Sequence, residues 1–364
     1  MNNKKIICFQ LLNDYSGSPK VLKTVLDGLC RNDIPVDLYT SETQGVLNEL
    51  KGRENFQIHT YRYNFSDNPL VTLFRFTWIQ VLTFFWAFKY AFCSNVVFYI
   101  NTLLPIGPAL AGRIMGKRVI YHYHENADVK GGFYRFLAAG MQRLAHEIIC
   151  VSKYQSLFLR RQDKVTVIPN AIPAKLVGKL SQDVAAGYAR QTVLMLGSLR
   201  EYKGTVEFYR LAHALPAYRF VFVVNDTQTN IDLFVREKGL VQPDNLMVYD
   251  RQRDVSKFYN ESSLVLNLSN KNLFIETFGL TALEAMSAAL PIIVPTVGGI
   301  AEMVDDGVNG YKIDVQDLDQ IEAKITEILS DKDLYEHLSQ NALKKSRQYN
   351  EETMINKIEK IIKK

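Results

Sequence analysis

Two glutamates, Glu276 and Glu284, stand eight positions apart in the segment ETFGLTALE. The apolar residues after Gly279 recur at helical spacing, which predicts that Glu276 lies in a loop and Glu284 in the first turn of a helix. A glycine-containing loop that enters a helix presents unbonded backbone N–H groups and the positive end of the helix dipole, which suit a phosphate. Flanking carboxylates suit hydroxyl groups. A structural alternative is a capping box formed by Thr281 and Glu284.

A second segment with chemical potential, GSLREYKG, directly follows the apolar run from Thr192 to Gly197. A strand that ends in glycine, with cationic residues before the next helix, is an arrangement that can neutralise a diphosphate. Lys203 is the stronger candidate for this role, and Arg200 is a second one.

Two histidines, His122 and His124, alternate in the apolar run RVIYHYH, so on a strand they would share one face. A hydrolase with an H-x-H-x-D-H motif uses such a pair to hold a metal ion. The Asp and the third His of that motif are missing from the sequence HYHENA, so we expect no metal here. His124 is then either a ligand-binding residue or a hydrogen-bonded structural histidine.

These segments together resemble retaining glycosyltransferases of family 4. The likeness is strongest around the two glutamates, where it includes Glu276, Phe278, Gly279, Leu280, Glu284, Pro291, Gly298, Gly299 and Glu302. GSLREYKG is similar to the family's G-R-L-x-x-x-K-G, with Lys203 in register and Ser198 in place of the Arg. VSKYQ and VIPNAI are similar to the end of the family's N-terminal domain and its linker.

The resemblance implies a retaining transfer of a sugar from a nucleotide diphosphate donor, with no metal and no cofactor. Glu276 would bind the hydroxyls of the donor sugar, Lys203 the diphosphate, and His124 a sugar hydroxyl from the opposite domain; these three are the expected catalytic residues. Glu284 would bind the ribose. The full set of expected donor-binding residues is Gly17, Ser198, Arg200, Phe278, Gly279, Leu280, Thr281 and Glu284.

The elements that must position these residues alternate between short apolar runs and amphipathic segments in both halves of the chain. This alternation predicts an α/β fold with two domains. The sequence PNAIP, from Pro169 to Pro173, cannot be helical and reads as a linker. The resemblance implies the GT-B arrangement, two Rossmann-like domains facing across a cleft: 1–172 for the acceptor, 173–345 for the nucleotide sugar, and a helix in 346–364 that returns to the first domain.

Composition places the chain among soluble globular proteins, with 47% hydrophobic and 22% charged residues. The net charge of +5 is uneven, because residues 113–161 hold nine basic and three acidic residues, which gives 9 − 3 = +6. The four cysteines are scattered singly and indicate neither a disulfide framework nor a zinc site. The apolar run near the N-terminus is too short for a signal peptide, so we expect a cytoplasmic protein.

The segment from Phe74 to Phe98 is crowded with aromatic residues. Its longest uncharged part, Phe76–Phe88, is thirteen residues and falls short of a membrane span of about 20 residues. A buried core helix is the plainer interpretation. The alternative is an interfacial helix that, with the basic segment, contacts the anionic inner face of the cell membrane, where a lipid-linked acceptor would be met.

The expected partners are a UDP- or GDP-sugar donor and a glycan or lipid-linked glycan acceptor in surface polysaccharide biosynthesis. The base is left undetermined, because the loop Val248–Arg251, which the resemblance places against it, carries Asp250 where the family has Gly. Two other classes stay open. An epimerase of the same fold would turn over the nucleotide sugar without an acceptor. A nucleic-acid-binding protein would explain the basic segment, but the nearby aromatics are not interleaved with Lys and Arg, so we expect no nucleic acid.

Overall fold

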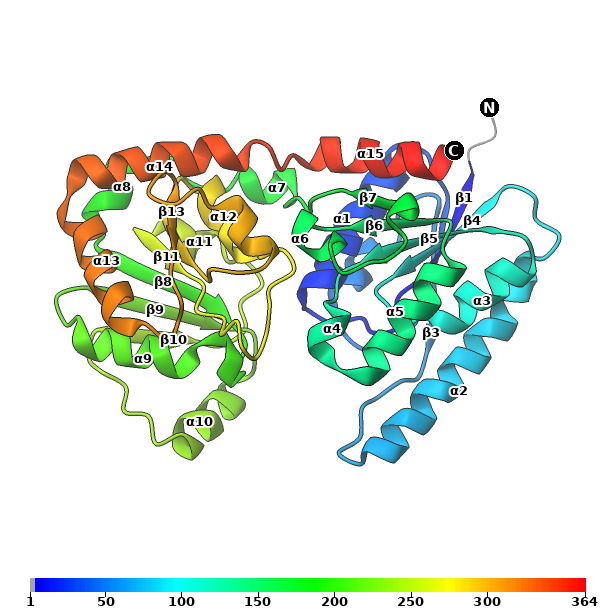
Figure 1. Cartoon of the computed structure of the whole chain (residues 1–364), viewed down its shortest axis with the longest axis horizontal. Helices are drawn as coiled ribbons and strands as arrows, with labels where there is room; N and C mark the ends of the chain where they lie inside the picture. Colours follow the sequence, from blue (N-terminus) through cyan, green and yellow to red (C-terminus); the bar gives the residue numbers. More distant parts are fainter. Residues whose placement is uncertain (1–3) are drawn as a thin grey trace. The chain divides into compact units, whose positions relative to one another are not determined.

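The computed structural model describes residues 4–364, which divide into two compact units (Figure 1). One unit runs up to Asn170 and includes Glu351–Lys364, and the other is Ala171–Asn350. The boundaries expected from the sequence, after residues 172 and 345, lie close to these divisions. Each unit is described by itself below.

The N-terminal unit is organised on a parallel sheet with the strand order β3-β2-β1-β4-β5-β6-β7 (Figure 1). Its central strands are apolar and buried along nearly their whole length, because helices cover both faces of the sheet. The strands are β1 (Lys5–Phe9), β2 (Val36–Ser41), β3 (Phe56–Tyr61), β4 (Val96–Asn101), β5 (Arg118–Tyr123), β6 (Glu147–Cys150) and β7 (Val165–Val167).

The helices of this unit connect successive strands, and the last one returns from the end of the chain. They are α1 (Gly17–Arg31), α2 (Pro69–Ala87), α3 (Ile106–Ile114), α4 (Ala127–Lys130), α5 (Gly132–Leu144), α6 (Lys153–Ser156) and α15 (Glu351–Lys363), with short 3-10 turns at η1 (Val46–Leu50), η2 (Phe88–Tyr90) and η3 (Gln162–Lys164). Helix α15 packs on α1, where Gly28 lies directly against Ile355.

The C-terminal unit repeats the architecture with a parallel sheet in the order β10-β9-β8-β11-β12-β13. The strands are β8 (Thr192–Gly197), β9 (Arg219–Val224), β10 (Leu246–Tyr249), β11 (Leu264–Leu266), β12 (Ile292–Val294) and β13 (Gly310–Lys312). Around them lie α7 (Ala174–Val177), α8 (Val184–Ala189), η4 (Glu201–Lys203), α9 (Thr205–Ala214), α10 (Gln228–Glu237), α11 (Ser256–Asn260), α12 (Leu280–Ser287), η5 (Gly299–Met303), α13 (Leu318–Ser330) and α14 (Lys332–Ser346).

The helix that the sequence predicted within residues 346–364 begins a few residues later, and a separate helix precedes it. Helix α14 ends at Ser346 and α15 begins at Glu351. Between them the Tyr349 ring packs edge-on against Phe278, with ring centroids 5.8 Å apart. Glu351 and Glu352 then suit the positive N-terminal end of the second helix.

Helix α2 differs from the buried core helix that was the plainer expectation. Asn68 caps it by accepting a hydrogen bond from the Leu70 N–H, and the helix continues into η2. Only one face is buried, and most of its large apolar side chains are exposed. The sequence argument that counted only the thirteen uncharged residues Phe76–Phe88 was also wrong, because the helix continues through Arg75. Pro69–Tyr90 is the one described helix long and apolar enough, by length and composition alone, to cross a membrane.

Candidate active site

The expected site residues of the C-terminal unit gather where the order of its strands reverses. Strand β8 pairs with β9 on one side and with β11 on the other, so the loops after β8 and β11 diverge from adjacent strand ends. Such a switch point is where open α/β sheets bind ligands. Lys203 lies in the loop after β8, and Glu276 lies in the loop after β11.

Lys203 and Glu276 form an ion pair, although they are far apart in the sequence. The two side chains are only 20% and 15% exposed, and Ser269 Oγ donates a second hydrogen bond, of 3.0 Å, to the Glu276 carboxylate. Burial opposes ionisation of Glu276, but the Lys203 charge and the hydrogen bonds from Lys203, Ser269 and Asn267 outweigh it and hold its pKa below the usual value. Glu276 is therefore a carboxylate at neutral pH.

Aromatic packing and a tight backbone contact hold Lys203 in place. Its Nζ lies 4.2 Å from the centre of the Phe274 ring, which stacks on Tyr202 at 4.8 Å. Gly204 follows with φ +77°, and a Cβ there would come within 2.4 Å of the Leu268 carbonyl oxygen. Glycine is thus required both by the backbone conformation and by the close approach of the β11 loop.

The glycine-rich loops around Glu276 bring backbone N–H groups to the same strand ends. Gly279, with φ +92°, precedes helix α12, and it has no side chain that could bond to the first-turn N–H groups of Leu280 and Thr281. Gly298 packs so closely that a Cβ there would lie 2.5 Å from the Glu276 carbonyl oxygen, and the Gly299 N–H donates to that oxygen at 2.8 Å. The N-terminus of α12 therefore suits an anionic group.

Glu284 lies within α12 and is 9% exposed, with its Oε2 accepting a 2.6 Å hydrogen bond from the Tyr259 hydroxyl. The capping-box alternative is wrong, because Gly279 is the N-cap and Thr281 is already inside the helix. Burial and the neighbouring carboxylate raise the pKa of Tyr259 well above its usual value, so the phenol stays protonated as a donor. This bond orients Glu284.

Ser198 and Arg200 lie in the same β8 loop as Lys203, and Arg200 is exposed, with its backbone N–H bonded to the Ser198 carbonyl at 2.8 Å. At the ends of β9 and β10, Arg251 Nε donates a hydrogen bond to Asn225 Oδ1 at 2.9 Å. Arg251 belongs to the loop that the sequence analysis expected to contact the nucleotide base.

Sequence reasoning did not identify Asn225, Ser269 or Tyr259, since none of them belongs to a recognisable motif.

In the N-terminal unit, the strand order reverses between β1 and β4, and the expected residues follow the strands of that region. Gly17 is the first residue of α1, exposed, and Asp14 braces the preceding loop by accepting from the Ser16 N–H at 2.8 Å. His124 directly follows β5, which neighbours β4.

His124 is held by a chain of side-chain amides. Its Nε2 lies 3.0 Å from Asn101 Oδ1, and Asn101 Nδ2 donates to Gln10 Oε1 at 2.7 Å. Because the Asn101 amide nitrogen is committed to Gln10, its oxygen accepts from His124, which places the imidazole proton on Nε2. Burial lowers the pKa of His124 to about 3, so it is neutral at pH 7 and Nδ1 carries the lone pair.

His122 shares a face with His124, as expected, with ring centroids 4.2 Å apart. Its Nδ1 is 2.8 Å from the Tyr99 hydroxyl, and burial lowers its pKa far below the usual value. Glu125 accepts hydrogen bonds from the Leu103 and His124 N–H groups and ties the ends of β4 and β5 together. Within residues 4–364, no group of three His, Cys, Asp or Glu side chains is arranged to hold a metal ion.

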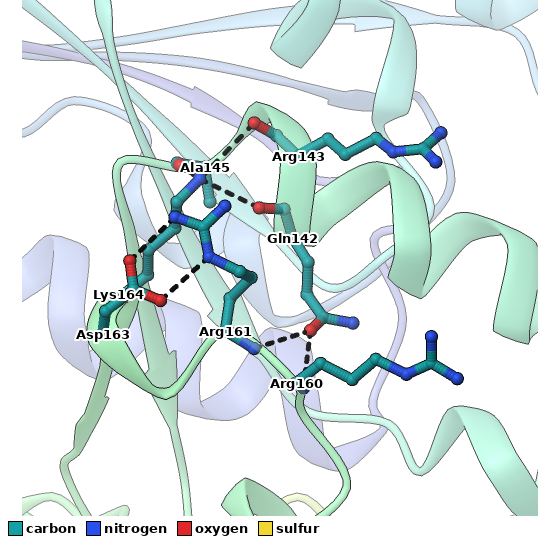
Figure 2. Close-up of polar contacts among 7 residues, drawn as sticks. All are labelled: Gln142, Arg143, Ala145, Arg160, Arg161, Asp163 and Lys164. Atoms are coloured by element: carbon teal, nitrogen blue, oxygen red, sulfur yellow. Dashed lines mark hydrogen bonds and ion pairs between the residues drawn. The ribbon is translucent and has the colours of Figure 1, made fainter.

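Several basic residues in and beside the segment 113–161 make contacts within the N-terminal unit: Lys117 donates to the Ala91 and Cys93 carbonyls, and Arg118 lies 3.8 Å from Glu147. Lys164, just beyond this segment, donates to the carbonyls of Gln142 and Ala145 at the end of α5, and Arg161 pairs with Asp163 at 2.8 Å (Figure 2). Figure 2 shows the guanidinium groups of Arg143 and Arg160 pointing away from Asp163. In the part of the chain that the structure describes, these two groups have no hydrogen bond or ion pair.

Two family models match the chain. The model described as "Glycosyl transferases group 1" matches residues 180–345, and "Glycosyltransferase Family 4" matches residues 15–176. Among curated proteins, N-acetyl-alpha-D-glucosaminyl L-malate synthase of Bacillus anthracis is 33% identical over 29% of this chain and 26% of its own length. The uncharacterized glycosyltransferase MJ1607 of Methanocaldococcus jannaschii is 27% identical over 54% of each chain. The matches thus span from about a quarter to about half of these relatives.

Solved structures match over almost the whole chain. Anabaena Alr3699/HepE in complex with UDP and glucose aligns with a TM-score of 0.76 at 19% identity, covering 99% of this chain and 100% of that one. Sucrose-phosphate synthase from Thermosynechococcus elongatus aligns with a TM-score of 0.78 at 16% identity, covering 99% and 98%. These likenesses establish the two-domain α/β fold of the GT-B type.

Proposed function

Because this chain belongs to the group 1 glycosyltransferases, we propose that it transfers a sugar from a nucleotide diphosphate donor to a hydroxyl of a glycan or lipid-linked glycan, with retention of configuration and without a metal ion. The proposed setting is surface polysaccharide biosynthesis in the cytoplasm, at the inner face of the cell membrane. The observation that carries the proposal is the largely buried Lys203–Glu276 pair, with side chains 20% and 15% exposed, beside the N-terminus of α12.

The chemistry of this site suits departure of a nucleoside diphosphate. As the bond between the anomeric carbon and the diphosphate oxygen breaks, negative charge grows on the phosphate, and the partly buried Lys203 and the N–H groups at the start of α12 would stabilise that charge. Arg200, in the same loop, is proposed to add a second cation. Glu276, held as a carboxylate, accepts hydrogen bonds from the sugar's hydroxyls.

The proposed transfer takes place on the side of the sugar from which the diphosphate leaves. The acceptor oxygen forms the new bond to the anomeric carbon, and its proton passes to the departing phosphate oxygen, so configuration is retained. His124, neutral with its proton on Nε2, is proposed to accept at Nδ1 a hydrogen bond from a hydroxyl of the sugar. Glu284, oriented by Tyr259, binds the ribose hydroxyls.

The solved structures of Anabaena Alr3699/HepE in complex with UDP, with UDP-glucose, or with UDP and glucose support a uridine diphosphate sugar as the donor. The test is a thermal-shift panel of UDP- and GDP-sugars, in which a donor at about 100 times its Kd adds about 2.7 kcal/mol to the free energy of unfolding. The stabilising donor is then used for transfer in EDTA, and NMR reads the anomeric configuration of the product. Inversion, loss of activity in EDTA that Mn²⁺ restores, or donor turnover without an acceptor would each contradict part of the proposal.

A further inference from the structure

An apolar stripe runs along the outer face of α2. It consists of Leu70, Phe74, Trp78, Val81, Phe85 and Phe88, spaced 4, 4, 3, 4 and 3 residues apart, which places all six on one side of the helix. Each of these side chains is between 37% and 75% exposed. An isolated exposed apolar residue needs no explanation, but a contiguous row of this length indicates an interaction surface.

The opposite face of α2 is anchored in the N-terminal unit. Phe76, Ile79 and Ala87 are buried, and Gln80 Oε1 accepts a 3.0 Å hydrogen bond from the Gly107 N–H of α3. The two backbones approach so closely that a Cβ on Gly107 would lie 2.2 Å from the Gln80 carbonyl oxygen. To cross a bilayer, α2 would have to abandon these contacts and the strands beneath them, so its length and composition do not make it a membrane span.

The charges around the stripe identify its partner. Three helices here contain no Asp or Glu: α2, α3, which packs on α2, and α5, which packs on α3 and reaches α2 through the contact of Phe133 with Phe76. They carry Arg75, Arg113, Arg135 and Arg143, and Lys89 lies in η2, into which α2 continues. A second copy of the same surface would place like charges against each other. An anionic bilayer surface instead offers negative headgroups to the basic side chains and acyl chains to the aromatic rings.

We propose that the α2 stripe is a docking surface for anionic lipid, with α2 lying in the plane of the membrane interface while its inner face stays packed on the sheet. Binding therefore has two parts. The aromatic and aliphatic side chains enter the boundary between headgroups and acyl chains, and the basic residues are attracted to the negative surface, so added salt weakens the binding. This inference goes beyond glycosyl transfer and is tested without donor or acceptor.

The two tryptophans of the chain, Trp78 and Trp86, both lie in α2, and they face different environments. Trp78 belongs to the stripe, whereas Trp86 packs against Tyr39 and Tyr61 in the core. A Trp86→Phe variant of the full chain leaves Trp78 as a single fluorescent reporter. On phosphatidylcholine vesicles containing phosphatidylglycerol, we expect its emission to shift to the blue. Lipids brominated near the glycerol end of the acyl chain should quench it more strongly than lipids brominated near the methyl end.

Vesicle co-sedimentation with Phe74→Ser/Phe85→Ser measures the contribution of the stripe, and we expect affinity to fall roughly tenfold or more. The matched control makes the same kind of change at exposed apolar residues of the other unit, Leu233→Ser/Val241→Ser, which should leave binding unchanged. Circular dichroism and thermal melting of each variant verify that it is folded.

Four outcomes would overturn the proposal: equal binding to neutral and anionic vesicles, no binding at low salt, resistance of bound protein to alkaline extraction, or a dimer in light scattering that Phe74→Ser/Phe85→Ser dissociates. The third would indicate a spanning helix and the fourth a self-association surface. None of these outcomes touches donor binding, so the proposed transferase activity stands or fails separately.

Discussion

Replacing Lys203 by Met should damage stability and phosphate binding together, because its partner Glu276 is 15% exposed. Without the lysine charge, burial dominates and the pKa of Glu276 rises. A buried group left without its partner costs about 1 to 3 kcal/mol of the free energy of unfolding. A charge-assisted contact to phosphate is worth about 1.5 to 3 kcal/mol, so UDP should bind about ten- to a hundredfold more weakly. Uridine, which lacks phosphate, should bind as before.

The pH dependence of this loss follows from the direction of the pKa shift. In the wild type the lowered pKa of Glu276 contributes stability above the unfolded value of about 4.3, and this contribution is lost as pH falls through the folded pKa. In Lys203→Met the carboxylate destabilises the folded state above that value. The deficit should therefore be largest at neutral pH and shrink under acidic conditions, as measured by urea unfolding across the pH range.

A double-mutant cycle that combines Lys203→Met with Glu276→Gln measures the energy of the pair. The losses in free energy of unfolding of the two single variants should differ in sum from that of the double variant by about 0.5 to 3 kcal/mol. As a control, Lys179→Met removes an exposed ion pair with Asp254, which should cost about 0 to 1 kcal/mol and leave UDP affinity unchanged. Strict additivity of the Lys203 and Glu276 losses, or unaltered UDP binding by Lys203→Met, would refute the reasoning.

Three further predictions concern single elements of the site. Gly279→Ala forces a Cβ to within 2.6 Å of the Ile300 side chain at φ +92°, so it should lower the free energy of unfolding by about 1 to 3 kcal/mol, and a neutral effect in urea unfolding would contradict the loop geometry. Tyr259→Phe should weaken binding of the whole donor and of uridine equally, because Glu284 loses its orienting bond, whereas free pyrophosphate should bind unchanged by calorimetry. The low pKa of His124 means that the unfolded chain takes up a proton near the ordinary value of about 6.5 while the folded chain does not, so stability should fall as pH drops from about 6.5 towards 3. His124→Gln should make that part of the profile less steep, and the lowered pKa of His122 accounts for a further part of the slope.

Sequence reasoning was most successful where apolar runs are continuous. β8 has the bounds of the apolar run Thr192–Gly197, because a buried parallel strand is apolar on both faces. β3 was missed, since it is the edge strand of its sheet and its sequence FQIHTY mixes polar and apolar residues. The exposure of the outer face of α2 could not be predicted either. A helix that is apolar on all sides has no periodicity in its sequence that would distinguish the buried face from the exposed one.

Within the site, Lys203 and Glu276 were predicted individually, but their pairing depends on the neighbouring positions of β8 and β11, which no local pattern encodes. The capping box failed because spacing alone cannot reveal that Gly279 takes a positive φ and moves the helix start. Tyr259 was invisible as the partner of Glu284, because its contact crosses from α11 to α12.

The return of α15 to the N-terminal unit has a consequence for biosynthesis. Its residues Met354, Ile355 and Ile358 are buried, and Ile355 packs against Gly28 of α1. The N-terminal unit therefore needs Glu351–Lys364 to cover the apolar seam on α1, whereas the C-terminal unit is one continuous stretch, Ala171–Asn350. The unit that emerges first is thus completed last, and a nascent chain truncated before Glu351 would expose that seam to chaperones or to aggregation.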